Sequence, residues 1–135
     1  MQYAESFKKL GYDLVSPRQD WSAENSDGVC ISIWREELDK HSLLPRLDLW
    51  TLHPDPAAAT WRSKPGHEKR TRHLARALSE FDRRVDVVLV SGIPGQSYRD
   101  ADPWLVAKRG GWWSISNFDV TNGYFVAEVK KAPKP

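Results

Sequence analysis

The chain has 135 residues, a single cysteine (Cys30) and a formal net charge of +2 at pH 7. This length predicts one globular domain over residues 1–130, with a core large enough to need no disulfide, and a loose tail over residues 131–135. The N-terminus has no apolar secretory segment, and no apolar run approaches the ~20 residues that cross a bilayer. A cytoplasmic protein with no membrane partner is therefore expected.

The charges are unevenly distributed along the chain. Residues 1–61 contain six Lys and Arg against ten Asp and Glu, whereas residues 62–84 contain eight against three, and residues 85–135 contain six against five. This asymmetry predicts either a polyanionic partner or self-association between faces of opposite charge, as in a homodimer.

The first half of the chain predicts short elements separated by long irregular segments. They are a helix over 4–10 ended by Gly11, a strand over 12–15, a loop over 17–28, a strand over 29–34, a helical turn over 35–40, a strand over 47–52 and an irregular segment over 53–66. Within the strand over 29–34, Val29, Ile31 and Ile33 share one face, and Cys30 and Trp34 lie on the other.

The second half contains the clearest periodicity. The sequence predicts an amphipathic helix over 67–82, a central apolar strand over 85–91, a loop over 92–103, a short helix from Pro103 to Lys108 with Asp102 as its N-cap, and a hairpin of strands over 112–120 and 124–130. Asn122-Gly123 predicts a two-residue turn between the last two strands.

These elements indicate the fold class. Hairpins and short strands around one long helix, without a repeating strand-helix-strand order, predict an α+β fold. We expect a curved, largely antiparallel sheet of about five strands, one main amphipathic helix and a C-terminal β-hairpin.

Three residues of the hairpin form the pattern D-x8-E-x-K: Asp119, Glu128 and Lys130. In metal-dependent nucleases of this pattern, carboxylates on a hairpin hold Mg²⁺, and a lysine lies near the attacking water. The predicted turn places Asp119 opposite Val126 and diagonal to Glu128, about 7–8 Å apart at the backbone. A magnesium-dependent nuclease is one alternative, but only five residues follow Lys130, too few for a supporting helix. Exposed hairpin charges are the simpler interpretation.

The histidines do not predict a metal site. His67 and His73 lie six residues apart, which places them on different sides of a helix. Thr71 stands where the zinc motif HExxH needs its second histidine. No catalytic motif, metal site or cofactor is predicted from the sequence.

Seven tryptophans and a basic segment are the most informative features. Trp34, Trp50 and one of the Trp112/Trp113 pair are predicted to lie in the core, because adjacent strand residues face opposite sides. Trp21 and Trp61 lie in polar, proline-containing loops, where an indole either anchors the loop or is exposed for stacking.

Cations are gathered near Trp61 and along one face of the predicted helix: Arg62, Lys64, Lys69, Arg72, His73 and Arg76. Cations that follow phosphates, with aromatic side chains that stack on bases, are typical of proteins that hold single-stranded or flipped nucleotides. Together with Trp21 and Trp61, these residues predict a non-enzymatic module that binds an unpaired or modified base of a nucleic acid. A small-molecule-binding or self-associating accessory protein is the alternative.

Three stretches carry a family resemblance: LVSPRQDWSAENSDGVCISIW at 14–34, WRSKPG followed by RHLARA within 61–77, and DVTNGYFVAE at 119–128. They resemble a family of small uncharacterised bacterial proteins often carried on mobile elements, including integron gene cassettes. No activity is assigned to that family, so the resemblance implies no catalytic residue. A small curved sheet with aromatic loops is also loosely similar to PUA-like and EVE-like readers of modified bases, by analogy of fold alone.

Overall fold

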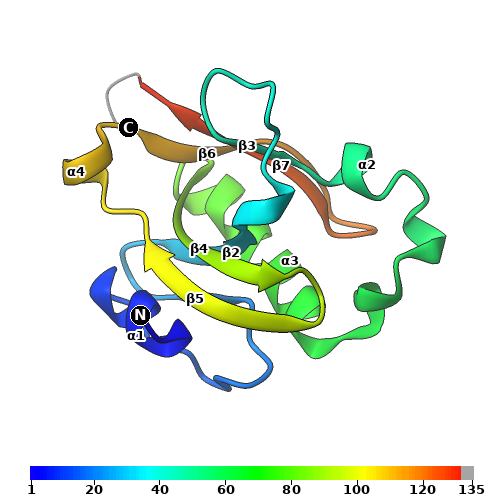
Figure 1. Cartoon of the computed structure of the whole chain (residues 1–135), viewed down its shortest axis with the longest axis horizontal. Coiled ribbons are helices and arrows are strands. Elements are labelled where there is room, and N and C mark those ends of the chain that lie inside the picture. The colour runs from blue at the N-terminus through cyan, green and yellow to red at the C-terminus, as the bar shows by residue number, and fades with distance from the viewer. Residues whose placement is uncertain (132–135) are drawn as a thin grey trace.

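The computed structural model describes residues 1–131, in which seven strands form one curved sheet (Figure 1). The sheet order is β1-β2-β4-β6-β7-β3, with β5 also paired to β4. The strands are β1 (Ser22–Glu24), β2 (Val29–Trp34), β3 (Arg46–Asp48), β4 (Arg84–Ile93), β5 (Ser97–Pro103), β6 (Trp112–Asp119) and β7 (Tyr124–Lys130). All pairs are antiparallel except β2 with β4. The predicted α+β class and largely antiparallel sheet are confirmed, with seven strands rather than about five.

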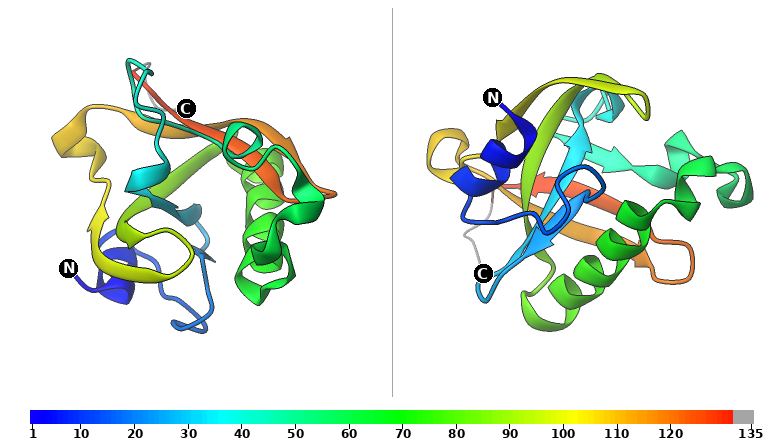
Figure 2. Two further views of the ribbon diagram at one scale, coloured as in Figure 1. Left: turned by 45° about the vertical axis from the view of Figure 1, so that its right-hand side comes forward. Right: turned by 90° about the horizontal axis from the view of Figure 1, so that it is seen from below.

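One long helix, α3 (Pro65–Glu80), lies against one side of this sheet (Figure 2). Its start at Pro65 follows from the fixed φ of proline, which suits the first helical position. The other helical elements are α1 (Tyr3–Lys9), α2 (Leu49–Leu52) and α4 (Val106–Arg109), with 3-10 turns η1 (Arg35–Glu37), η2 (Pro56–Ala58) and η3 (Thr60–Ser63). The predicted helices over 4–10 and 67–82 and the turn after Trp34 are confirmed.

Strand β4 is the centre of the fold because both of its edges are paired. It pairs with β2 along one edge and with β6 and then β5 along the other. Its alternate side chains are buried on opposite faces, one against α3 and the other against α1. The apolar run VVLV, which lacks polar alternation, is what a strand covered on both faces requires.

The strand β2 has the predicted alternation. Val29, Ile31 and Ile33 belong to the core on the α3 side, and Cys30 belongs to the core on the α1 side. Burial raises the pKa of the Cys30 thiol well above its usual value, so the thiol is an inert core side chain. Trp34 packs against the same α1-side cluster.

Two segments predicted to be loops contain strands. β1 lies within residues 17–28, and β5 lies within residues 92–103. Both escape a search for periodicity, since β1 is only three residues long and the first four residues of β5 are exposed. Residues 12–15 form no strand; instead the Tyr12 side chain is buried and its hydroxyl donates to Asp86 at 2.6 Å.

Two predicted boundaries next to an aspartate are wrong, for different reasons: Asp48 caps a helix, and Asp102 pairs with Leu89 of β4. The run over 47–52 splits into β3 and α2, because the Asp48 carboxylate accepts hydrogen bonds from the amides of Trp50 and Thr51 at 2.9 and 3.3 Å. Asp102 and Pro103 belong to β5 rather than to a helix start, and α4 begins only at Val106.

Replacement of Asp48 by alanine is expected to lower the free energy of unfolding by about 1 kcal/mol, as is usual for loss of an N-cap. The substitution removes the acceptor for two backbone amides of α2. Urea unfolding measures the change, and Asp48→Asn, which keeps a capping oxygen, serves as the control. Equal losses in the two variants would contradict a capping role.

The register of the C-terminal hairpin also differs from the prediction. Asp119 pairs with Tyr124 rather than Val126, so the connection has four residues instead of two, and a bulge lies between Ile115 and Asn117. Glu128 therefore lies four residues along β7 from the partner of Asp119, about 13 Å at the usual rise per residue. The predicted diagonal pair of carboxylates is wrong. Asp119 accepts from Thr121.

The tryptophan pair at the start of β6 is buried on both sides of the sheet. Trp112 and Trp113 are 8% and 1% exposed, and Trp113 packs edge-on against Trp104 at 5.6 Å. The sequence predicts that one of the two lies in the core. Both are in fact buried, because both faces of this strand are covered. The predicted tail over 131–135 lies outside the described residues apart from Lys131, whose ammonium donates to the Arg109 carbonyl.

Candidate ligand-binding pocket

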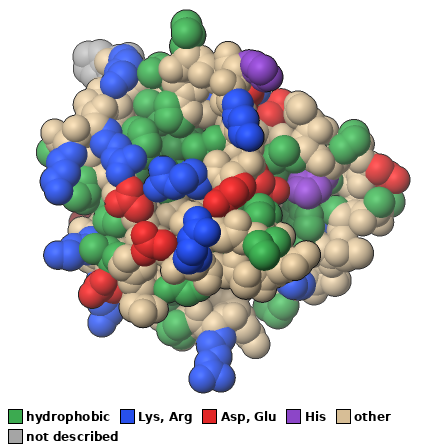
Figure 3. Space-filling model, viewed as in Figure 1, with side chains coloured by type: hydrophobic (Ala, Val, Ile, Leu, Met, Phe, Trp, Pro, Cys, Tyr) green, Lys and Arg blue, Asp and Glu red, His purple; other side chains and the backbone are tan. Residues whose placement is uncertain are grey.

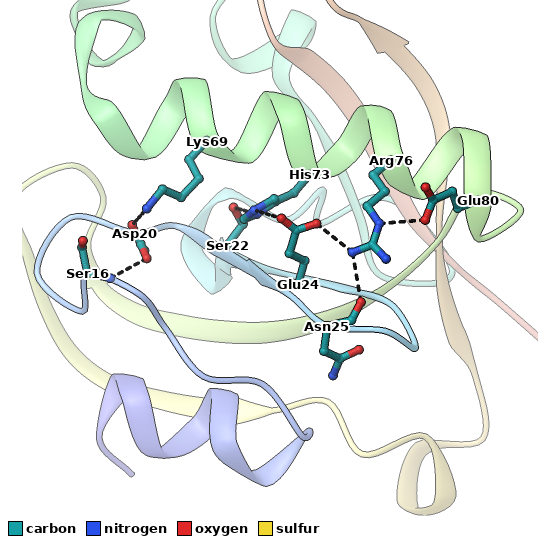
Figure 4. Close-up of polar contacts among 9 residues, drawn as sticks. All are labelled: Ser16, Asp20, Ser22, Glu24, Asn25, Lys69, His73, Arg76 and Glu80. Carbon is teal, nitrogen blue, oxygen red and sulfur yellow. Dashed lines mark hydrogen bonds and ion pairs between the residues drawn. The ribbon is translucent and has the colours of Figure 1, made fainter.

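Two cations of α3, Lys69 and Arg76, face acidic side chains of this same chain (Figure 4). Lys69 pairs with Asp20 at 2.7 Å, and Arg76 pairs with both Glu24 and Glu80 at 2.7 Å. The hydrogen bond from Arg76 holds the pKa of Glu24 below its usual value. Two carboxylates of the acidic first third of the chain therefore pair with two of the cations of the basic helix within one molecule.

His73 is part of the same contact between α3 and β1. It is buried between the Ser22 hydroxyl, 2.7 Å from Nδ1, and Glu24, 3.2 Å from Nε2 (Figure 4). Burial lowers the pKa of His73. This side chain connects the helix to the sheet and is not presented to solvent.

The other predicted phosphate-binding residues differ in their accessibility. Arg62 donates to the Pro56 carbonyl at 2.9 Å, while Lys64 and Arg72 are exposed and have no charged partner within residues 1–131. The predicted basic surface thus retains few free cations. On another face of the molecule, shown in Figure 3, Lys and Arg are also interspersed with Asp and Glu.

A pocket of about 620 Å³ opens beside the N-terminal half of α3. A pocket of this size suits a small organic ligand. Its lining residues come from segments far apart in the sequence: Tyr3, Pro17, Arg18, Asp20, Trp21, Ser32, Ile33, Trp34, Glu37, Leu49, His53, Thr60, Trp61, Lys64, Arg70, Val90, Pro94, Gly95 and Tyr98.

Trp21 and Trp61 form one aromatic wall of this pocket. Their ring centroids are 6.3 Å apart, and Trp61 is stacked on Tyr124 at 5.8 Å with an angle of 21° between the planes. His67 packs edge-on against both indoles. Each of the two loop tryptophans is therefore partly buried as an anchor and also faces the pocket.

Arg70 is the charged residue at the inner end of the pocket. It is only 9% exposed, and its guanidinium lies over the rings of Phe125, Trp21 and Trp61 at 4.9, 5.0 and 5.7 Å. Its Nε is buried without a partner, and no acceptor within residues 1–131 takes a hydrogen bond from the guanidinium. Burial lowers its pKa to about 10.

Arg70 is not among the site residues that the sequence predicts, although its position carries a signal. Position 70 precedes Leu74 by four residues and Ala77 by seven, so the helical period places it on their buried face. Because charged residues are seldom buried without a partner, an arginine at such a position indicates a specialised environment.

Glu37 and His53 lie at another part of the pocket wall. The Glu37 carboxylate is 3.5 Å from Nε2 of His53, and burial raises its pKa. The charge of Arg70 lowers the pKa of Glu37 and the charge of Glu37 raises the pKa of Arg70, but the two side chains form no direct ion pair. The pocket lining therefore contains a cation and a carboxylate that do not pair with each other.

Acidification from pH 6.5 to about 4 is expected to destabilise the fold through His67. Burial and the neighbouring cations Arg70 and Arg62 lower the pKa of His67 from 6.5 to about 4. The unfolded chain keeps the higher pKa, so it takes up the proton first as the pH falls. The contribution of His67 to the free energy of unfolding is therefore fully present above pH 6.5, and it declines progressively as the pH falls from 6.5 to about 4.

Urea unfolding at stepped pH values measures this slope. His67→Gln is expected to flatten the slope without abolishing it, because burial also lowers the pKa of His73. An unchanged slope in His67→Gln would show that the titration belongs to other groups.

Searches against protein families, curated proteins and solved structures find no match to this chain. The resemblance to a family of mobile-element proteins therefore stays a prediction. Within residues 1–131 no helix is long and apolar enough to cross a membrane, and no group of three or more His, Cys, Asp or Glu side chains is arranged to hold a metal ion.

Proposed function

We propose that this protein binds a small planar molecule with an anionic group in the pocket beside α3. The observation that carries the proposal is Arg70, a buried guanidinium without a hydrogen-bond acceptor within residues 1–131. A buried, unpaired charge is costly, and an anionic ligand group would supply the acceptors that its donors need.

The aromatic wall defines the rest of the ligand. Trp21 and Trp61 present indole surface to the pocket, and Tyr3, Trp34 and Tyr98 lie along its other sides. Indole and phenol rings favour flat, apolar ring systems, which they contact by stacking or edge-on. A planar ring with a negative charge at one end matches both the rings and Arg70.

Nucleic-acid binding, the leading sequence hypothesis, has less support from this geometry. Affinity for a polyanion grows with the number of phosphates that free cations neutralise. Lys69 and Arg76 are paired within the chain, and His73 is buried. Nucleic-acid binding by the basic surface of α3 stays a prediction. Binding of a single small ligand in the pocket is the function that the site supports better.

The decisive experiment compares 2-naphthoate with the neutral 2-naphthamide, two probes of the same ring and similar size. Titrations followed by ¹H–¹⁵N spectra report on the indole N–H groups of all seven tryptophans. We expect 2-naphthoate to shift the resonances of Trp21 and Trp61 and to bind at least about tenfold more tightly, the discrimination expected when a polar group loses its partner.

Arg70→Met tests the residue that carries the proposal, with Arg72→Met, exposed on the same helix, as the matched control. The first variant is expected to lose the preference for 2-naphthoate and the second to keep it. Equal binding of the two probes by the wild type, or shifts confined to tryptophans outside the pocket, would overturn the proposal.

A further inference from the structure

The pocket lining contains two complementary kinds of hydrogen-bonding group on either side of Trp61. The Arg70 guanidinium lies 5.7 Å from the centre of the Trp61 ring, and His53, which pairs with Glu37, packs on the same ring at 5.4 Å. Arg70 supplies only donors, and Glu37 when ionised supplies only acceptors. Oε2 of Glu37 is 3.5 Å from His53, whereas its Oε1 and the whole Arg70 guanidinium have no hydrogen-bond partner within residues 1–131. Both side chains line the pocket and form no ion pair with each other, so the edge of a flat ligand that lies beside Trp61 can engage both.

Such an edge must carry an acceptor next to a donor in the plane of a ring. Guanine has this arrangement, with O6 and N7 as acceptors beside the N1–H and N2–H₂ donors. Arginine binds O6 and N7 in a bidentate manner. A carboxylate can accept from N1–H and N2–H₂ with its two oxygens. Adenine presents a donor at N6 and an acceptor at N1, the reverse of what Arg70 and Glu37 require.

The outer end of the pocket carries two further cations. Arg18 and Lys64 line both this pocket and an adjoining groove of about 370 Å³. Both side chains are exposed, and neither has a charged partner within residues 1–131. They contrast with Lys69 and Arg76, which are neutralised by carboxylates of the chain. A phosphate group at this end would meet free cations.

From these two ends we infer that the ligand is a nucleoside monophosphate with a guanine-type base. The base lies among the pocket tryptophans with its polar edge on Arg70 and Glu37, and the phosphate lies between Arg18 and Lys64. This inference rests on the proposed pocket and specifies its ligand class. The base edge supplies the acceptors for Arg70, and the anionic group of the ligand lies at Arg18 and Lys64 rather than at Arg70.

Calorimetric titrations with GMP, IMP, AMP and guanosine test the inference. GMP should bind best, and IMP, which lacks the 2-amino group, should be weaker. AMP should be weaker than GMP by about tenfold or more, since its edge leaves Arg70 and Glu37 unpaired. Guanosine, without the phosphate, should bind less tightly than GMP and with less dependence on salt.

Two variants assign the ends of the ligand. Glu37→Gln should lose most of the preference for GMP over AMP, with Glu68→Gln, exposed on α3, as its control. The double variant Arg18→Ala/Lys64→Ala should weaken GMP to the level of guanosine, with Lys108→Ala, which lies outside the pocket, as its control.

Equal affinity for GMP and AMP, or an unchanged preference in Glu37→Gln, overturns the guanine assignment. If 2-naphthoate still binds through Arg70 in that case, the planar-anion pocket stands without it. If neither nucleotides nor 2-naphthoate bind, both proposals fall. A guanine-containing single-stranded oligonucleotide that binds more tightly than GMP would also overturn the assignment, in favour of a polymeric ligand.

Discussion

Arg70→Met is expected to raise the free energy of unfolding by about 1 to 3 kcal/mol, the range seen when buried charges give way to apolar side chains of similar size. The lowered pKa of Arg70, about 10, corresponds to a cost on the order of 3 kcal/mol for keeping the side chain charged. Methionine fills a similar space, and its sulfur packs well against aromatic rings.

The opposing effect is the loss of the contacts between the guanidinium and three rings. Each such contact contributes about 0.5 to 2 kcal/mol, but methionine retains the apolar part of these contacts. Arg72→Met, on the exposed side of α3, should change stability by less than about 0.5 kcal/mol. Urea unfolding of both variants decides the matter; a stability loss in Arg70→Met would mean that the guanidinium holds the core together.

Gly66→Ala is expected to lower the free energy of unfolding by about 2 kcal/mol, as for other residues forced into a packed space. A Cβ at Gly66 would contact the backbone carbonyl of Gln19 and come within 2.7 Å of the Trp21 ring. The Gln19 carbonyl has little freedom to move, because the next residue, Asp20, is paired with Lys69 of α3. Either α3 or the loop that carries Trp21 must therefore shift. The intrinsic preference of alanine for a helix, about 1 kcal/mol, offsets only part of this cost.

The same substitution should disturb the pocket, because Trp21 forms its aromatic wall. Urea unfolding gives the stability, and the indole N–H resonance of Trp21 reports the local change. Glu68→Ala introduces the same side chain on the exposed face of the same helix and should leave both measurements nearly unchanged. An unperturbed Trp21 resonance in Gly66→Ala would contradict the close approach of helix and loop.

The elements that the sequence predicts well are those with a strong local pattern. The helix α3 has a clear apolar face, and β4 has an uninterrupted apolar run, so both are recognisable without a structure. The strand β5 is different, because its exposed residues and its proline resemble a loop, and only pairing with β4 makes it a strand. The hairpin register depends on a bulge that its turn residues do not indicate.

The pocket could be predicted only in part for a related reason. Trp21 and Trp61 stand out by residue type, but the residues that join them in the pocket lie between positions 3 and 98. Contacts across such distances follow from the strand order and leave no local pattern. The sequence predicts Lys69 and Arg76 on a free surface, because their partners Asp20 and Glu24 are about fifty residues away in the sequence.

The burial of Cys30 gives the chain a built-in reporter of ligand occupancy. It is the only thiol, and it lies at 0% exposure in the core between α1 and the sheet. A thiol reagent can therefore modify it only during opening of that core, and the labelling rate measures how often opening occurs. A ligand that binds only the closed protein slows labelling by the factor 1 + [L]/Kd. Candidate ligands can thus be ranked by protection of Cys30, a thiol that does not itself line the pocket.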